Sequence, residues 1–366
     1  MNFPVDYPSI LDRINEIDPV RYAKTRNFID GAVTYLSPYL SRGIITLPQV
    51  KDAVLKRGYK PNQIEKFLQE LAWREFFQRV WFANGNDLLK DLKQPQEGVA
   101  HEQMIAAVAN AKTGIDAIDE QINQFYETGY LHNHVRMYIA GITCNIGKAY
   151  WLQPSRWMYY HLLDGDVASN TCSWQWVAGS FSSKKYIANQ ENINKYLQSH
   201  QQQTFLDHTY ETILHQPIPD SLKETTELKL TTTLPSTDAT FKIDSNKDLC
   251  IYTSYWLNPQ WRIDKDYNRI LLLEPSHFER FPVSDKVMRF IVDAAKANIK
   301  GLQLFVGAFE ELQQHLQTGQ NVYFIDHPLH RRFKGWADPY PWMFPQVTGS
   351  FGSFFSYWKK AERYLK

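Results

Sequence analysis

The sequence contains no apolar run that approaches the ~20 residues needed to cross a membrane. Its opening stretch, MNFPVDYPSI, also lacks the basic start and following apolar segment that mark a secretory signal peptide. Both absences favour a soluble protein, which we expect in the cytoplasm and without a membrane partner.

Cysteine is scarce. Cys144, Cys172 and Cys250 lie far apart and form no CxxC pair. This pattern favours buried thiols in a reducing compartment over a disulfide or a zinc site. His132 and His134 are two positions apart, so they point to different sides of a helix, and no HExxH motif accompanies them. We therefore expect no metal site.

Neither sign of charge predominates, because the 40 Lys and Arg residues are balanced by 39 Asp and Glu residues, for a net charge of +1. This balance neither supports nor excludes a nucleic-acid partner, since binding depends on a local basic surface. The glycine-containing turns match neither a dinucleotide fingerprint nor a Walker loop, so no nucleotide site follows from the C-terminal half. No nucleophile elbow is present either, which disfavours a hydrolase.

Aromatic residues, in contrast, are abundant at 14%, which predicts large aromatic cores or stacking sites. A length of 366 residues favours two domains. Helical periodicity dominates residues 1–198, polar residues dominate 199–247, and strand-like and helix-like segments alternate in 248–366. We expect an α+β protein: an all-α domain, a connector, and a small α/β domain with a mainly parallel sheet and an aromatic, basic tail.

A long helix is predicted from Pro61 to Phe82, with apolar residues on more than one side. Glu70, Trp73 and Arg74 share one face of it. The simplest interpretation of Glu70 and Arg74 is an intrahelical ion pair. The alternative is that a carboxylate, an indole and a guanidinium line a pocket.

Ser37 followed by Pro38 predicts a helix start, with the hydroxyl as N-cap and the proline in the first turn. Together with Thr34, this helix start is suited to bind an anion such as phosphate. Most Ser-Pro pairs of this kind only cap a helix.

The central stretch runs from Tyr130 to Trp176 and contains YLHNHVRM and DGDVASNTCSWQW. Asp164 and Asp166 suit an acid/base pair or ligand binding equally well. Trp174, like Trp176, is of a type found more often in a core than in a functional site. The combined amides, arginine, carboxylates and indoles suit a large, polar, aromatic cofactor better than a small metabolite.

Four motifs become specific when taken together: LSPYLSRG, ELAWREFF, ETGYLHNHVRM and LLDGDVASNTCSWQW, in this order and at these intervals. They resemble the flavin-binding helical domain of the photolyase/cryptochrome family, and the resemblance covers residues from about 20 to 197. It implies a bound flavin adenine dinucleotide (FAD), folded into a U inside the helical domain.

The resemblance also implies which residues hold the cofactor. The phosphates and sugar would be held by Tyr22 and by Val33, Thr34, Tyr35, Leu36 and Ser37. Arg74 would add charge toward the pyrophosphate, and Phe67 would pack against the cofactor. Asp164 and Asp166 would bond the ribityl and ring edge, with Arg136 pairing Asp164. Asn170 would face N5 of the ring, where an amide does not titrate.

The substrate side implied by the resemblance is formed by Glu70, Trp73, Asn133 and Met137, with Asn170 completing the catalytic set. Members that repair cyclobutane pyrimidine dimers use such a Glu to stabilise the dimer anion and such a Trp to stack on the flipped-out base pair. Asn133 stands where members that repair the (6-4) lesion carry a catalytic His, so the cyclobutane substrate is preferred. The partner would be UV-damaged DNA, with phosphate and strand contacts also expected from Arg26, His134, Lys184 and Lys185.

Electron transfer in the family follows three tryptophans. Trp174 and Trp151 match the inner and middle positions, and the outer position falls in KQPQEGVAHEQ, which has no aromatic residue. Another exit, through Tyr150, Trp157 or Trp176, is the alternative. The stretch SSKKYIANQENINKY resembles the iron–sulfur prokaryotic branch, but its cluster cysteines are absent, so no cluster is predicted.

The predicted function is that of a light-driven deoxyribodipyrimidine photo-lyase, a carbon–carbon lyase acting as a monomer. One alternative is a cryptochrome-like blue-light photoreceptor, which the incomplete tryptophan series and the substitutions at Tyr130 and His134 favour. Repair of the (6-4) lesion is another, and a helical DNA-binding protein without flavin is a third. Family members begin with an α/β antenna domain, whereas here the α/β segment is C-terminal. It could be an antenna analogue, a partner module or packing support, and a second chromophore is unknown.

Overall fold

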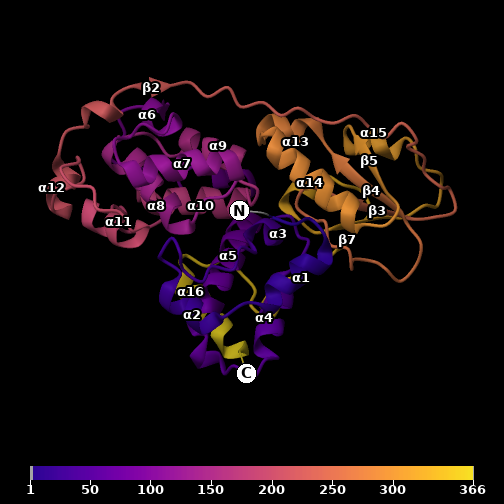
Figure 1. Ribbon diagram of the computed structural model, residues 1–366. Helices are drawn as coiled ribbons and strands as arrows, with labels where there is room; N and C mark the ends of the chain where they lie inside the picture. The colour runs from indigo at the N-terminus through magenta and orange to yellow at the C-terminus, as the bar shows by residue number, and fades with distance from the viewer. Residues whose placement is uncertain (1–2, 366) are drawn as a thin grey trace. The chain divides into compact units, whose positions relative to one another are not determined.

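The computed structural model describes residues 3–365 (Figure 1). The chain forms two compact units from interleaved segments. The first unit comprises Met1–Pro19, Thr34–Ala83 and Thr231–Lys366, and the second comprises Val20–Val33 and Asn84–Leu230. The sequence boundaries at 1–198, 199–247 and 248–366 follow composition rather than packing, and they stay a prediction.

The second unit is mainly helical. Its short hairpin pairs β1 and β2 antiparallel. The elements of this unit are α2 (Pro19–Thr25), β1 (Met104–Ile105), α6 (Ala106–Ala109), α7 (Asp116–Thr128), α8 (Asn133–Gly141), α9 (Leu152–His161), α10 (Val167–Ala178), α11 (Gln190–Leu197), α12 (Tyr210–His215) and β2 (Thr225–Thr226).

Helix α7 shows why such a segment forms a helix. Ile118, Ile122 and Phe125 recur at helical spacing and are fully buried. Gly129 ends the helix at φ 72°, where its N–H donates to the carbonyl of Phe125. The segment is therefore an amphipathic helix that ends in a glycine cap.

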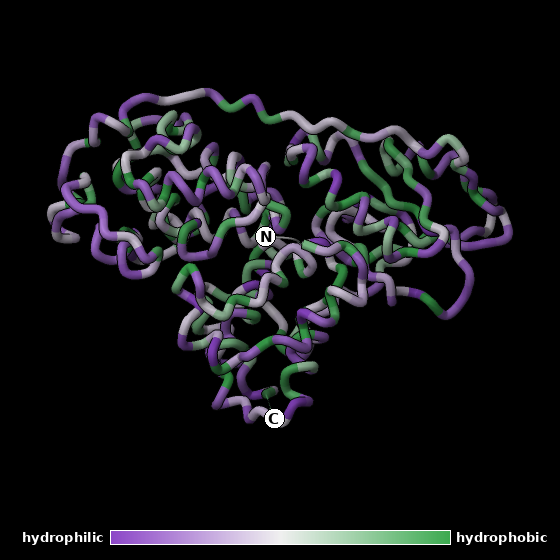
Figure 2. The backbone as a smooth tube through the Cα atoms, viewed as in Figure 1, coloured by the Kyte–Doolittle hydropathy of each residue, from purple (hydrophilic) through white to green (hydrophobic). Residues whose placement is uncertain are grey.

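The first unit contains a five-stranded sheet in the order β5-β4-β3-β6-β7, with every neighbouring pair parallel. The central strands β3 and β4 are almost entirely buried, as expected where a sheet is covered on both faces, and Figure 2 shows this part of the sheet as hydrophobic. The edge strand β7 is largely exposed. The predicted α+β class with a mainly parallel C-terminal sheet is confirmed. The strands are β3 (Leu249–Tyr252), β4 (Asn268–Leu273), β5 (Leu302–Val306), β6 (Val322–Ile325) and β7 (Trp336–Asp338).

Helices α13, α14 and α15 surround this sheet, and the remaining helices of the first unit come from the two ends of the chain (Figure 1). Their bounds are α1 (Tyr7–Asn15), α3 (Ser37–Ser41), α4 (Leu47–Leu55), α5 (Glu65–Asn84), α13 (Pro275–Arg280), α14 (Asp285–Asn298), α15 (Phe309–Gln313) and α16 (Phe354–Ala361).

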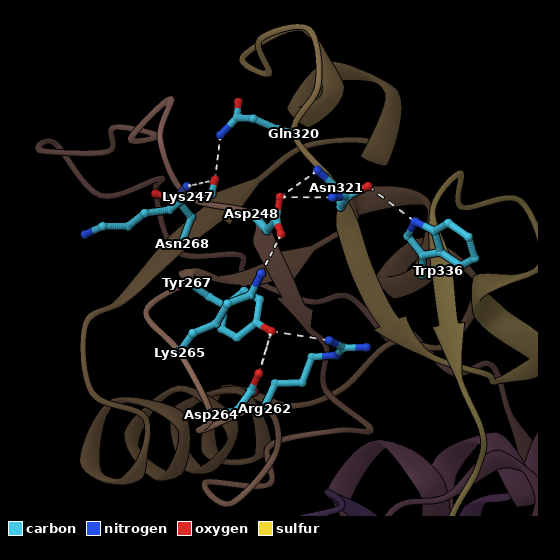
Figure 3. A network of polar contacts seen from close by, with 10 residues as sticks. All are labelled: Lys247, Asp248, Arg262, Asp264, Lys265, Tyr267, Asn268, Gln320, Asn321 and Trp336. Atoms are coloured by element: carbon cyan, nitrogen blue, oxygen red, sulfur yellow. Dashed lines mark hydrogen bonds and ion pairs between the residues drawn. The ribbon is translucent and has the colours of Figure 1, made fainter.

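Polar side chains connect the amino-terminal ends of the strands (Figure 3). The Asp248 carboxylate, just before β3, accepts from the Asn321 backbone N–H at 2.9 Å and from Lys265 Nζ at 3.0 Å. The Asn268 amide, at the start of β4, donates to the Lys247 carbonyl at 2.8 Å. These bonds fix where β3, β4 and β6 begin.

The three cysteines are free and buried, and burial raises the pKa of each thiol. Within residues 3–365, no helix has the length and apolar character that a membrane crossing requires.

Candidate cofactor and substrate site

A buried ion pair lies at the centre of the second unit's set of predicted residues. Arg136 Nη2 lies 2.9 Å from Asp164 Oδ2 and 3.1 Å from Oδ1, and Arg136 Nε donates to the Leu131 carbonyl at 2.9 Å. The Asp164 residue is only 6% exposed. A carboxylate this deeply buried requires a charged partner, which the guanidinium supplies.

The turn from Asp164 into α10 depends on Gly165. A Cβ at this position would lie 2.9 Å from the Tyr159 carbonyl oxygen and 3.0 Å from that of Leu162. Only glycine fits such a close backbone approach. The two carboxylates, at Asp164 and Asp166, are thereby held on either side of one tight turn.

Asp166 caps α10, because its carboxylate accepts from the Ser169 backbone N–H at 2.7 Å. Among residues 3–365, the buried Ser169 Oγ finds no hydrogen-bond partner. Asn170 follows in the same turn, and its Nδ2 donates to the Ser155 carbonyl at 2.9 Å. That bond assigns the amide nitrogen to the protein and leaves Oδ1 as the acceptor for a ligand.

The two predicted electron-transfer residues, Trp151 and Trp174, are buried in one core cluster of the second unit. Trp151 Nε1 donates to the Asp91 carboxylate at 2.7 Å. The part-buried Tyr150 shares that carboxylate through its hydroxyl at 3.3 Å, and its ring lies 5.5 Å from that of Trp151. Gln96, from the stretch without aromatic residues, accepts from the Trp151 backbone N–H at 3.0 Å.

The start of α8 carries three further predicted residues. Asn133 is exposed and its Nδ2 lies 3.8 Å from Met137 Sδ. His134 stacks on Tyr196 with ring centroids 4.9 Å apart. Burial and the nearby charge of Arg26 lower the pKa of His134 to about 4, so it is neutral at neutral pH.

Three further predicted residues of the second unit lie on α2 and after α10. Tyr22 lies on α2, and its carbonyl accepts from the Arg26 backbone N–H at 2.9 Å. Lys184 is exposed in a turn after α10. Lys185 Nζ donates to the Glu97 carbonyl at 2.7 Å, which uses one of its three N–H donors.

The first unit carries the other set of predicted residues, mostly on α5. Arg74 Nη2 donates to Ser41 Oγ at 2.8 Å, and Glu70 forms an ion pair with Lys66 at 3.2 Å. Phe67 is buried at 2% exposure. The prediction that α5 is largely buried is confirmed by apolar contacts on several of its sides.

The indole of Trp73 is part-exposed and stacks on Phe354 of α16, with centroids 3.9 Å apart and planes within 9°. The rings of Phe76 and Phe77 contact it at steeper angles. Trp73 is therefore held in one orientation by aromatic packing on one face.

The segment Val33–Ser37 leads into α3, with Val33 at the end of the second unit and Thr34 onward in the first. One expectation is corrected: α3 begins at Ser37, and Leu36 holds the capping position without a side-chain bond. Thr34 Oγ1 instead accepts from the Leu36 backbone N–H at 3.4 Å. Tyr35 adopts φ 53°, which bends the chain sharply before the helix.

Sequence reasoning missed the C-terminal segment that packs on α5. The buried carboxylate of Glu75 accepts from Phe344 N–H at 3.2 Å, from Tyr357 OH at 2.8 Å and from Arg79 at 3.0 Å. The spacing of Phe354, Tyr357, Trp358 and Ala361 marks an amphipathic helix, and that signal was available in the sequence. Its partner helix was not.

Comparison with known proteins agrees with the motifs. Residues 67–221 match the family described as the FAD binding domain of DNA photolyase. A deoxyribodipyrimidine photo-lyase from Agrobacterium fabrum is 32% identical over 169 residues, which is 43% of this chain and 34% of that protein. The Synechococcus protein of the same name is 31% identical, over 43% and 35% of the two chains. The matched segment thus spans about a third of the length of these relatives.

Solved structures are similar over about half of the chain. A class III photolyase from Agrobacterium tumefaciens has a TM-score of 0.43 and 28% identity, covering 52% of this chain and 42% of that one. A cryptochrome from Synechocystis has a TM-score of 0.45 and 22% identity, covering 54% and 44%.

Proposed function

We propose that this chain, whose residues 67–221 match the FAD binding domain of DNA photolyase, is a light-driven, FAD-dependent DNA photolyase that splits cyclobutane pyrimidine dimers. The observation that carries the proposal is the buried Arg136–Asp164 ion pair beside the α10 cap. Curated relatives named deoxyribodipyrimidine photo-lyase support it.

The residues at the start of α10 fit the polar edge of a flavin. The buried Ser169 Oγ lacks a partner in the part of the chain that the structure describes, and a ligand atom would satisfy it. Asp164, oriented by Arg136, and Asp166 offer carboxylate oxygens for ribityl and ring N–H or O–H groups. FAD, when bound, supplies the electron that light sends to the substrate and receives back.

Asn170 would present its amide oxygen to N5 of the ring. Its amide nitrogen already donates to the Ser155 carbonyl, so the oxygen is the free acceptor. An amide keeps this role at every pH, unlike a carboxylate. The other cofactor contacts, which stay predictions, are Tyr22, Val33, Thr34, Tyr35, Leu36, Ser37, Phe67 and Arg74.

On the substrate side, Trp73 would stack on a flipped-out base, because aromatic packing already fixes its orientation. Glu70 would stabilise the dimer anion, with Asn133 and Met137 completing the contact. Arg26, Lys184 and Lys185 would contact phosphates. His134, neutral at pH 7, would contribute hydrogen bonding or stacking rather than charge. Trp174 and Trp151 would carry electrons during light-driven reduction of the flavin.

A repair assay tests this function. The purified protein is reduced chemically, mixed with oligothymidylate containing cyclobutane dimers, and illuminated with blue light. Recovery of thymine absorbance only in the light is the expected result. Chemical reduction bypasses the tryptophan series, so the repair site is tested by itself. Bound flavin without recovery would overturn the cyclobutane substrate, and the same assay with (6-4) lesions would follow.

A cryptochrome-like photoreceptor is the second candidate. The observation favouring it is Gln96, an amide in the stretch expected to hold the outer aromatic residue, hydrogen-bonded to Trp151. Flavin that responds to blue light in a protein that repairs neither lesion would favour this function. A cytoplasmic location and a monomeric state stay predictions, as do the lack of a metal and the identity of any second chromophore.

A further inference from the structure

Helix α16, near the C-terminus, has two faces of opposite character. Phe354, Tyr357, Trp358 and Ala361 form the buried face. The outer face carries Phe355, which is 70% exposed, and the exposed side chains of Lys359 and Lys360.

The same outer surface continues into the turn after α16. Arg363 is exposed and Tyr364 is 50% exposed. From residue 355 to 364 this surface therefore combines two exposed aromatic rings and three cations with a single carboxylate, that of Glu362.

The inner face joins α16 to the predicted base-stacking residue. Phe354 is 2% exposed and stacks on Trp73 at 3.9 Å (Figure 1 shows α16 beside α5). Contacts with Phe76 and Trp358 lock the Phe354 ring, so it forms a fixed wall behind the indole. A second anchor is the 2.8 Å bond from Tyr357 to the buried Glu75 carboxylate of α5.

We propose that the outer face of α16 and its following turn bind the DNA strand that flanks the damaged bases. Lys359, Lys360 and Arg363 would contact phosphates, and the adjacent Phe355 ring would stack on an unpaired base. This inference rests on the proposed function in one respect: the repair function identifies the bound nucleic acid as damaged DNA.

The chemistry of the surface favours a single strand of nucleic acid. Proteins that hold such strands combine cations along the backbone with aromatic platforms for the bases. The surface carries three cations and one carboxylate, and this excess of positive charge is complementary to phosphates. Phe354 and Phe355 are consecutive, so the surface begins one residue from the ring that backs Trp73. Trp73 is the residue on which an opened base would stack.

The test compares two triple variants of the full-length protein. The first is Lys359→Gln/Lys360→Gln/Arg363→Gln. The matched control, Lys242→Gln/Lys300→Gln/Lys334→Gln, removes three other exposed cations of the same unit. Binding of an oligothymidylate is followed by fluorescence anisotropy over a range of salt concentrations. Thermal melting verifies that each variant folds, which we expect because all six side chains are exposed.

The α16 variant should bind at least tenfold more weakly at low salt, and the slope of log K against log salt should fall by about 2, at roughly 0.7 per phosphate contact. Phe355→Ala should weaken binding about tenfold through lost stacking and leave the slope unchanged. Control-like binding by both α16 variants would overturn the inference while leaving the repair function intact. The reverse outcome, α16-dependent binding without light-driven repair, would sustain the inference and overturn the repair function.

Discussion

Arg136 and Asp164 form an ion pair at 2.9 Å in which the carboxylate side chain is 4% exposed and the guanidinium side chain 22% exposed. The Arg136 side chain, which starts on α8, is thus partly exposed to solvent while its guanidinium pairs with the buried carboxylate. The same contact orients the carboxylate beside Gly165 and the α10 cap. One guanidinium thereby serves both stability and the shape of the candidate cofactor site.

Arg136→Met should lower the free energy of unfolding by about 3 kcal/mol, because it leaves a buried charge without its partner. Chemical denaturation measures the loss. The double variant Arg136→Met/Asp164→Leu should recover much of it, since a buried pair replaced by apolar side chains is often tolerated. Equal instability of the single and double variants would show that the pair itself is not the source.

Asn170→Asp should alter the redox course of bound flavin and lower stability by about 1 kcal/mol, because a carboxylate cannot donate to the Ser155 carbonyl. Spectral titration with a reductant follows the flavin, and thermal melting follows the protein. Asn110→Asp, at an exposed position, is the control. An unchanged redox course would count against the assigned place of Asn170 at N5.

Tyr150→Phe should slow light-driven reduction of the flavin in the presence of an external thiol. Tyr150 is part-buried and contacts Trp151, and both donate to Asp91. Burial and the Asp91 charge raise the pKa of Tyr150 to about 12, so the phenol keeps its proton in the resting protein. Asp91 is the nearby base for that proton when the ring gives up an electron.

Tyr126→Phe is the matched control for this experiment, since Tyr126 bonds Trp157 instead, at 2.9 Å. The rate of flavin bleaching under continuous blue light measures both variants. A several-fold slower rate for Tyr150→Phe alone is expected. If Tyr126→Phe were the slower of the two, the exit would run through Trp157.

The α7 helix, the buried α5 helix and the parallel strands could be predicted because each carries its own periodicity and caps. Asp164, Asp166 and Asn170 could be predicted as site residues because they lie close together within one recognisable motif. The interleaving of the two units could not be predicted. The Glu75–Tyr357 hydrogen bond joins positions 282 apart. The sequence around a glutamate inside a helix does not indicate which distant residue will bond to it. The stack of Trp73 on Phe354 was missed for the same reason.

Neutral buried histidines predict lower stability in acid. Burial lowers the pKa of His330 to about 4, where its ring contacts the Ile325 carbonyl and Thr253 Oγ1. The unfolded ring titrates near 6.5, so the unfolded chain binds more protons between about pH 6.5 and 4. Stability is therefore complete above that window and is lost as pH falls through it, by up to about 3 kcal/mol for this group.

Thermal melting from about pH 7.5 to 4.5 measures this dependence against the unfolded-state titration. His330→Gln should lower stability at neutral pH and flatten the pH dependence. His208→Gln, at an exposed position, should leave the pH dependence unchanged. Parallel pH profiles for wild type and His330→Gln would contradict the assignment.

Glu70→Ala should reduce dimer repair much more than flavin retention. The ion pair of Glu70 with Lys66 is partly exposed on both sides and is worth less than about 1 kcal/mol, so the variant should fold. Lys66→Ala breaks the same pair and is the matched control: it should keep both flavin and repair. The ratio of repair rate to bound flavin, measured on chemically reduced protein, separates the two roles.

Equal loss of flavin and repair in Glu70→Ala would make the residue structural. Loss of repair in both variants would assign the effect to the ion pair, because only the glutamate is expected to reach the dimer.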